Sequence, residues 1–275
     1  MIEDALRYPT RGDDAATTVL IGGGLGIASF VVAMLAVVLS FAFVGVFLLP
    51  FALVPGLFLQ GYLVSVVRHR LDGDPEPPRF ADWAGLFVDG LKSVVVAFVY
   101  SLPAVVGALL LGVVAALGAY GLDGANVGVA FGSLVAFVGV FAMFLYGLLV
   151  AYVFPAAVAN WVREDDLTAA FSLSALRDAT FDSRYLFAWV LAVVVALVGG
   201  TVGQALVILF FAGFFVLFYV QVVTWYLYVE GYAEARELAR PGTDDDDSAS
   251  EDDESEGDAG EDDQTTADSD DELRE

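Results

Sequence analysis

The side chains that could support catalysis or metal binding are few, and they lie outside the long apolar stretches of this sequence. His69 is the only histidine, cysteine is absent, and no Lys-Ser/Thr pair follows the glycine run at 22–24. A lone histidine cannot form a metal site or a Ser-His-Asp triad without partners, and a phosphate-binding loop needs that lysine. The acidic residues of the polar segments show no catalytic or metal-binding spacing, so we interpret them as solvated surface: Asp82, Asp89, Glu164, Asp165 and Asp166. The sequence therefore predicts no enzymatic activity, no cofactor and no metal.

The most polar side chains inside the apolar stretches are three glutamines, at Gln60, Gln204 and Gln221. One interpretation is that these amides form hydrogen bonds between neighbouring helices, each worth about 1 kcal/mol. The other is that they line a path for a small neutral solute. We favour helix contacts and keep a passive channel or facilitator as the alternative function.

Three G-x-x-x-G patterns occur, at Gly22/Gly26, Gly128/Gly132 and Gly199/Gly203. Glycines at this spacing let two helix backbones approach closely. We expect them to mark packing within the chain, and a dimer face is the second interpretation.

Arginines gather in the segments that flank the apolar stretches. Five of them are candidate contacts for anionic lipid head groups: Arg68, Arg70, Arg163, Arg177 and Arg184. Such clusters are typical of lipid contact, although the ordinary orientation signal of a membrane protein also explains them. The four tryptophans fall at the same boundary and are predicted interfacial anchors: Trp83, Trp161, Trp189 and Trp225. The expected partners are the lipid bilayer, including its anionic lipids, and a protein of unknown identity; no nucleic-acid partner is expected.

The chain is 58% hydrophobic and 17% charged, and four long stretches carry no charged residue. These are 15–67, 93–122, 124–162 and 185–229. A bilayer core about 30 Å thick needs about 20 apolar residues in a helix. Because two of the stretches can hold a helix, a turn and a second helix, the class is an all-α integral membrane bundle.

The sequence predicts six transmembrane helices in the domain 19–240. Their approximate ranges are 19–42, 50–67, 93–118, 128–152, 185–203 and 206–229. Glycines 199, 200 and 203 are taken to mark the end of the fifth helix or the turn that follows it. Short interfacial helices are expected at 80–91, where apolar residues recur at helical spacing, and at 167–178 with Asp166 as its N-cap.

Lys and Arg are confined to four segments: the N-terminal arm 1–18, the connection between the second and third helices, the connection between the fourth and fifth helices, and the C-terminal end. Six spans place all of these on one side, which the positive-inside rule makes cytoplasmic. We therefore expect a multi-pass protein of the cell membrane with both termini in the cytoplasm. Segment 241–275 is rich in Asp, Glu and Ser and is predicted to be a disordered acidic tail. Its acidity and the single lysine, Lys92, indicate a halophilic source, in whose salt carboxylates keep a surface hydrated.

A resemblance rests on Pro55-Gly56 through Gly61-Tyr62, the Arg68 cluster, Asp72-Gly73, Pro77-Pro78, and Trp83 with Leu86-Phe87-Val88-Asp89-Gly90-Leu91. Over about 1–238 the chain resembles an uncharacterised family of mostly haloarchaeal membrane proteins, the domain of unknown function four-zero-one-three. The resemblance implies a polytopic membrane protein and supplies no catalytic residues. The function expected is a structural or accessory protein that contacts lipids or partners at the cytoplasmic face.

Overall fold

The computed structural model describes residues 1–40, 45–120, 125–209 and 211–236. The described part is helical, in one compact unit that covers 1–239. Its elements are α1 (Ile2–Arg7), η1 (Tyr8–Thr10), α2 (Ala15–Ser40), η2 (Gly45–Leu48), α3 (Leu49–Leu71), α4 (Trp83–Tyr120), α5 (Ala125–Glu164), η3 (Leu167–Phe171), α6 (Leu173–Thr180), α7 (Ser183–Leu209) and α8 (Gly213–Ala235). The predicted acidic tail, 241–275, lies outside the described residues.

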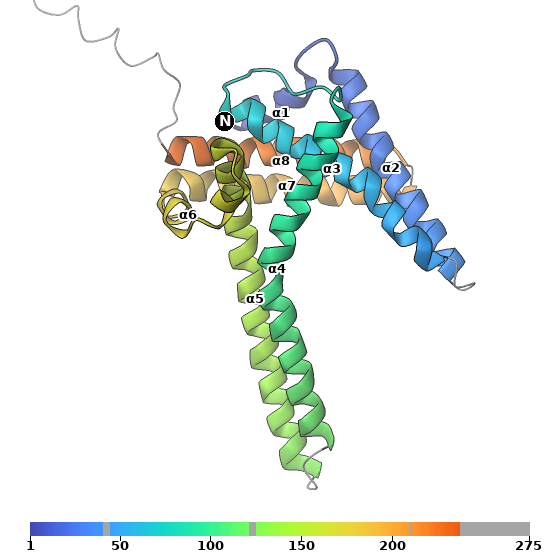
Figure 1. The fold of residues 1–275 in the computed structure, drawn as a ribbon, viewed down its shortest axis with the longest axis vertical. Coiled ribbons are helices and arrows are strands. Elements are labelled where there is room, and N and C mark those ends of the chain that lie inside the picture. Colours follow the sequence, from blue (N-terminus) through green and yellow to red (C-terminus); the bar gives the residue numbers. More distant parts are fainter. Residues whose placement is uncertain (41–44, 121–124, 210, 237–275) are drawn as a thin grey trace, which may run out of the picture. The chain divides into compact units, whose positions relative to one another are not determined.

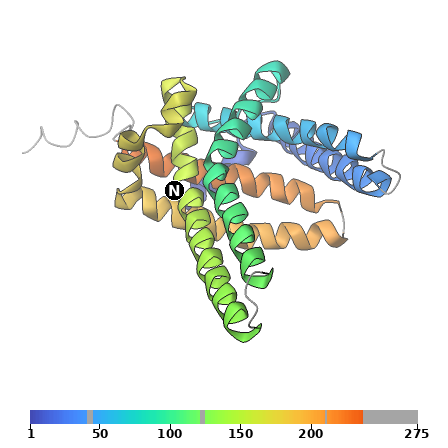
Figure 2. The same cartoon turned by 60° about the horizontal axis from the view of Figure 1, so that its bottom comes forward.

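The long helices form three hairpins, α2 with α3, α4 with α5, and α7 with α8. The two helices of each hairpin lie side by side in both views (Figures 1 and 2). Helix α3 also packs against α4, and α8 packs against both α2 and α3. Helix α8 also contacts α5, so it touches both of the other hairpins besides its own partner α7.

The buried core lies where the arginine-bearing ends of the helices meet. Its two apolar clusters are centred on residues such as Tyr62, Trp161 and Tyr185, all at most 1% exposed. Toward the turns the hairpins are covered by little protein, and the most apolar stretch of α5 has no buried residue. Exposed leucine, valine and phenylalanine on such a surface match a hydrocarbon surrounding.

Five described helices are long and apolar enough to cross a membrane. They lie in α2, α4, α5, α7 and α8. Helix α3 does not belong to these five; its last turn carries Arg68, His69 and Arg70, where cations interact favourably with the helix dipole. The described chain therefore fits a multi-pass membrane protein.

The predicted interfacial helix at 80–91 is not a separate element, which corrects the expectation from the sequence. Helix α4 begins at Trp83 and continues without a break through Lys92 into the apolar stretch. Asp82 caps its N-terminus by accepting a hydrogen bond from the Gly85 N–H at 2.9 Å. The charged residues Asp89 and Lys92 therefore lie within a continuous helix and do not mark its end.

The prediction that glycines 199, 200 and 203 end the fifth helix was also wrong. Helix α7 continues to Leu209, and two of these glycines face α8 instead. A Cβ added at Gly199 would lie 2.5 Å from the Val220 side chain, and one at Gly203 would lie 2.7 Å from Leu217. Together with Gly22, these contacts confirm that two of the G-x-x-x-G patterns pack helices within the chain.

The connection after α5 divides into two short elements rather than the single predicted helix at 167–178. Asp166 does act as an N-cap, because its carboxylate accepts from the Thr168 N–H at 2.9 Å, but it caps η3. Helix α6 then follows from Leu173 to Thr180, and Asp182 caps α7 through the Arg184 N–H at 2.7 Å.

The predicted polar arm 1–18 is more ordered than its composition indicates. Its first ten residues form α1 and η1, which pack on α8, and α2 already begins at Ala15. Ala5 and Tyr8 are fully buried there. The arm is therefore part of the helical unit.

Candidate functional site

The arginine face, defined here as Arg68, Arg70, Arg163, Arg177 and Arg184, is the first candidate region. Arg68 lies in the last turn of α3 and donates to the Asp89 carboxylate of α4 at 2.9 Å. Lys92 lies 3.7 Å from the same carboxylate. Asp89 thus joins two cations at the α3–α4 contact, and the charge of Arg68 is partly offset within the protein.

Arg70 is held more tightly than any sequence pattern indicates. Its side chain is only 7% exposed and donates to the Glu230 carboxylate of α8 at 2.5 Å. The guanidinium also lies 4.3 Å from the centre of the Tyr226 ring, a distance that gives a cation–π attraction. A buried, paired cation is not available to a lipid head group, so Arg70 serves the α3–α8 contact.

Tyr8 of η1 covers the same ion pair from the N-terminal side. Its ring lies 4.9 Å from Tyr226, and its hydroxyl donates to the Glu76 carbonyl at 3.2 Å. Burial raises the pKa of Tyr8 well above its ordinary value, so the hydroxyl stays protonated and remains a donor. Tyr8 therefore contributes to the burial of Arg70, whose guanidinium lies 5.8 Å from the centre of its ring.

Two further arginines of the arginine face carry ion pairs with near neighbours. Arg163 lies 2.8 Å from Glu164, and Arg184 lies 3.3 Å from Asp182. The hydrogen bond from Arg184 lowers the pKa of Asp182, so this partly exposed carboxylate stays charged.

Arg177 differs, because it is exposed on α6 and has no ion pair within the part of the chain that the structure describes. Leu173 and Phe181 lie one turn before it and one turn after it on the same helix face. They are 83% and 84% exposed. We call Leu173, Arg177 and Phe181 the α6 face; it is an apolar surface with a cation at its centre.

The tryptophans occupy different environments. Trp83 is 42% exposed and contacts Phe58, while Trp189 and Trp225 are half-buried. The Trp189 indole donates to the Ala151 carbonyl at 3.1 Å. Trp161 is 1% exposed and lies under Lys92 in the protein core. Its ring packs against protein, which differs from the anchoring position predicted for it.

A buried polar group that sequence reasoning missed joins α5, η3 and α8. Asn160 is 2% exposed and donates to the Ala169 carbonyl, while its own oxygen accepts from the Tyr232 hydroxyl, both at 2.8 Å. The only signal for it was a single asparagine in an otherwise apolar run. Since its donor and acceptor are both used internally, it serves packing.

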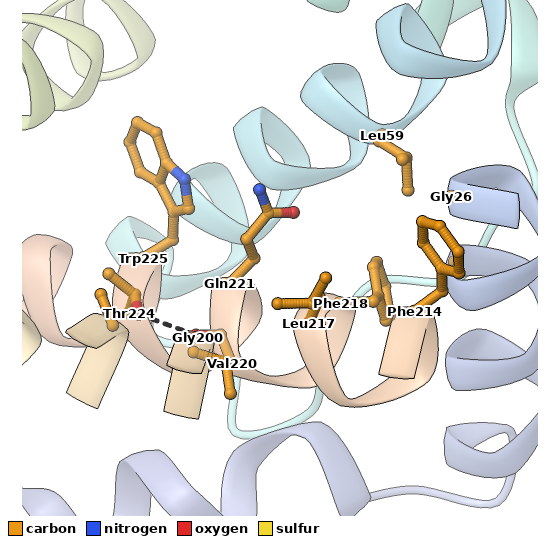
Figure 3. A pocket seen from close by; sticks show the side chains of 12 residues that line it. Gly26, Leu59, Gly200, Phe214, Leu217, Phe218, Val220, Gln221, Thr224 and Trp225 are labelled. Atoms are coloured by element: carbon orange, nitrogen blue, oxygen red, sulfur yellow. Dashed lines mark hydrogen bonds between the residues drawn. The ribbon is translucent and has the colours of Figure 1, made fainter. Parts of the chain in front are cut away.

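The second candidate region is an apolar cavity of about 340 Å³ between α2, α3, α7 and α8, which we call the intramembrane pocket. Glycines 22, 26 and 200 contribute backbone to its wall, and Leu59, Phe214, Phe218 and Trp225 contribute apolar side chains. Figure 3 shows the Gln221 amide reaching from α8 into this space. A cavity of this size lies at the lower end of the range for small-molecule sites.

Gln221 brings an amide to the middle of α8. At about 1.5 Å per residue it lies about 12 Å from Gly213 and about 13 Å from Glu230. No side-chain hydrogen bond of this amide occurs to any residue that the structure describes, whereas the neighbouring Thr224 hydroxyl donates to the Val220 carbonyl at 2.7 Å. The wall of the pocket is otherwise almost entirely apolar.

The other two glutamines are not part of this cavity. Gln60 is half-buried on α3 and Gln204 is exposed on α7, and neither lines the intramembrane pocket. The structure thus does not gather the three amides into one polar path among the described residues. The described residues also contain no group of three His, Cys, Asp or Glu side chains that could hold a metal ion.

A family model described as a protein of unknown function, DUF4013, matches residues 44–229. The match begins one position before η2 and ends within α8. It is shorter than the range 1–238 over which the resemblance was expected. No curated protein and no solved structure matches the chain.

Proposed function

This chain belongs to the DUF4013 family, and from that premise we propose that it is a non-enzymatic accessory protein of the cell membrane that contacts anionic lipids at its cytoplasmic face. The observation that carries the proposal is the α6 face, where an exposed arginine without an ion pair to any described residue lies between two highly exposed apolar side chains. Interfacial helices have this arrangement: their apolar side chains lie at the boundary of the acyl chains, and their cations lie at the depth of the lipid phosphates.

The position of α6 in the chain supports this contact. The helix lies between α5 and α7, two of the five helices able to cross a membrane, and Phe181 precedes the start of α7 by two positions. A short helix held at both ends by spans stays close to the head groups. Because Leu173 and Phe181 are 83% and 84% exposed, lipid is the surrounding that removes them from water.

The proposal is tested with Arg177→Gln. We expect about a fivefold loss in the preference for anionic over zwitterionic lipid, since one basic residue near a charged surface contributes about 1 kcal/mol. The measurement is mass spectrometry of the lipids retained by detergent-purified protein after delipidation. The loss should shrink at high salt, which screens the attraction.

Arg163→Gln is the matched control, because Arg163 lies on the same connection but is paired with Glu164 at 2.8 Å. It should change the lipid preference little. Equal effects of both substitutions, or no effect of Arg177→Gln, would refute the α6 face as the lipid contact and leave a protein partner as the remaining interpretation of that surface.

We also propose that α3 supplies a sixth span, so that both termini lie in the cytoplasm. Support comes from its length, Leu49–Leu71, and from the placement of Arg68 and Arg70 at the end that the other arginines share. The halophilic source and the role of the acidic tail stay predictions from composition.

The sixth span is tested with Phe47→Cys and Asp72→Cys, which flank α3 in a chain that has no cysteine of its own. In intact cells an impermeant thiol reagent should label position 47 and leave position 72 unlabelled until the cells are opened. Ile208→Cys, in the last turn of α7, and Asp182→Cys, just before its first residue, provide the reference pair. Labelling of 47 and 72 from the same side would show that α3 does not span.

The passive channel or facilitator has weaker support. It was based on three glutamines, and only Gln221 lines the intramembrane pocket. A polar path through apolar helices needs more than one such group at different depths.

A further inference from the structure

We infer that the intramembrane pocket binds a small apolar carbonyl compound dissolved in the membrane, of the quinone type, whose oxygen accepts a hydrogen bond from the Gln221 amide. This site is separate from the α6 face and does not depend on the lipid contact proposed there.

The first support is the state of the amide itself. A primary amide in hydrocarbon without a hydrogen-bond partner costs free energy, so intramembrane polar groups usually find one. Thr224, one turn away, satisfies its hydroxyl on the backbone of its own helix, but no described residue offers a partner to Gln221. Gln221 is an exposed residue of α8, and its side chain lines the open cavity (Figure 3).

The second support is the shape and chemistry of the wall. Gly22 and Gly26 pack α2 against the phenylalanines of α8, as a Cβ at Gly22 would lie 2.4 Å from the Phe218 ring. Gly200 has no such neighbour, because a Cβ there would meet nothing within 4 Å. Its missing side chain therefore leaves space rather than allowing helix contact. Phe214, Phe218 and Trp225 contribute aromatic rings to the wall, and such rings pack well against a flat apolar ring.

The third support is depth. Gln221 lies midway between Gly213 and Glu230, about half a bilayer core from either end of the span. The ester and head-group oxygens of ordinary lipids lie at the interface and do not reach this level. A compound that carries its oxygens on a ring within the hydrocarbon does reach it, and its carbonyl is the acceptor that an amide N–H requires.

The test uses a short-chain naphthoquinone and the fluorescence of Trp225, which lines the pocket. In protein reconstituted in vesicles, the quinone should quench a saturable component that is absent from Trp225→Phe. Gly200→Leu should weaken this binding about tenfold or more, because the added side chain occupies the cavity. Gln221→Leu should weaken it about fivefold, the factor that corresponds to one intramembrane hydrogen bond of about 1 kcal/mol.

Gly24→Leu is the matched control, since a Cβ at Gly24 also meets nothing within 4 Å and this residue does not line the pocket. It should bind the quinone like the parent protein. Quenching that stays unchanged in Gly200→Leu, or in Gln221→Leu, would overturn the inference.

A second arm replaces the quinone with lipids brominated near the chain end. The carbonyl proposal is wrong if three results occur together: these lipids quench Trp225 strongly, Gly200→Leu abolishes that quenching, and the quinone does not compete with it. An ordinary lipid chain would then fill the pocket. Competition by the quinone supports it.

Discussion

Gly61→Val is expected to lower the melting temperature in detergent by about 10 °C, corresponding to about 3 kcal/mol or more of stability. A Cβ at Gly61 of α3 would lie 1.8 Å from the Leu86 carbonyl oxygen of α4. The contact is reciprocal, because a Cβ at Gly90 would lie 2.0 Å from the Leu57 carbonyl oxygen. Backbone atoms cannot escape by changing rotamer, so the two helices must move apart.

Gly56→Val on the same helix is the control, since a Cβ at that position meets nothing within 4 Å. It introduces the same β-branched residue at the same cost in helix propensity. The difference between the two melting temperatures, measured by circular dichroism, isolates the clash. Equal values would show that α3 and α4 do not cross at Gly61 and Gly90.

These two glycines also belong to the segments on which the family resemblance rests. Gly61 precedes Tyr62, and Gly90 lies in the run from Leu86 to Leu91, so the resemblance includes both sides of the closest backbone contact between α3 and α4. The part of the sequence with the most recognisable pattern is thus the part with the least room for substitution.

Apolar length and the distribution of charge were enough to predict an all-helical chain with helices able to cross a membrane. They failed at helix ends. Hydropathy indicates where a chain passes between water and lipid, but a helix ends where its backbone hydrogen bonds end. Helix α4 therefore continues through Asp89 and Lys92, where the pattern indicated a boundary. Glycines in α7 gave the same difficulty, since a glycine that ends a helix and one that meets α8 look identical in sequence.

The candidate sites were predictable only as sets of residue types. Five arginines near the membrane boundary look alike in sequence, yet Arg70 is buried against Glu230, 160 positions away, while Arg177 stays exposed. Pairing over such a separation depends on how the hairpins pack. The same holds for the glutamines, because only the contact of α8 with α2 and α3 places Gln221 in a cavity.

Glu230→Leu is expected to destabilise the protein by about 3 kcal/mol, because it leaves the Arg70 guanidinium buried without its counter-charge. Arg70 is 7% exposed, and its remaining contacts are the Asp74 carbonyl at 3.3 Å and the rings of Tyr226 and Tyr8. None of these neutralises a charge. The measurement is thermal melting in detergent beside the parent chain.

The double variant Arg70→Met/Glu230→Leu separates loss of the pair from exposure of a lone charge. Replacing both partners by apolar side chains removes the unpaired cation, so the double variant should regain most of the stability lost in Glu230→Leu. Glu3→Leu provides the exposed reference, because Glu3 and Arg7 form an ion pair at 2.8 Å with both side chains more than 70% exposed. Such a pair contributes at most about 1 kcal/mol. Two results would show that the pair is not the buried link between α3 and α8. One is that Glu230→Leu melts like Glu3→Leu, and the other is that the double variant is less stable than Glu230→Leu. If the double variant regains the melting temperature of the parent chain, the stability lost in Glu230→Leu comes from the desolvation of an unpaired Arg70. That result would also explain why Tyr8 of the N-terminal arm covers this cation.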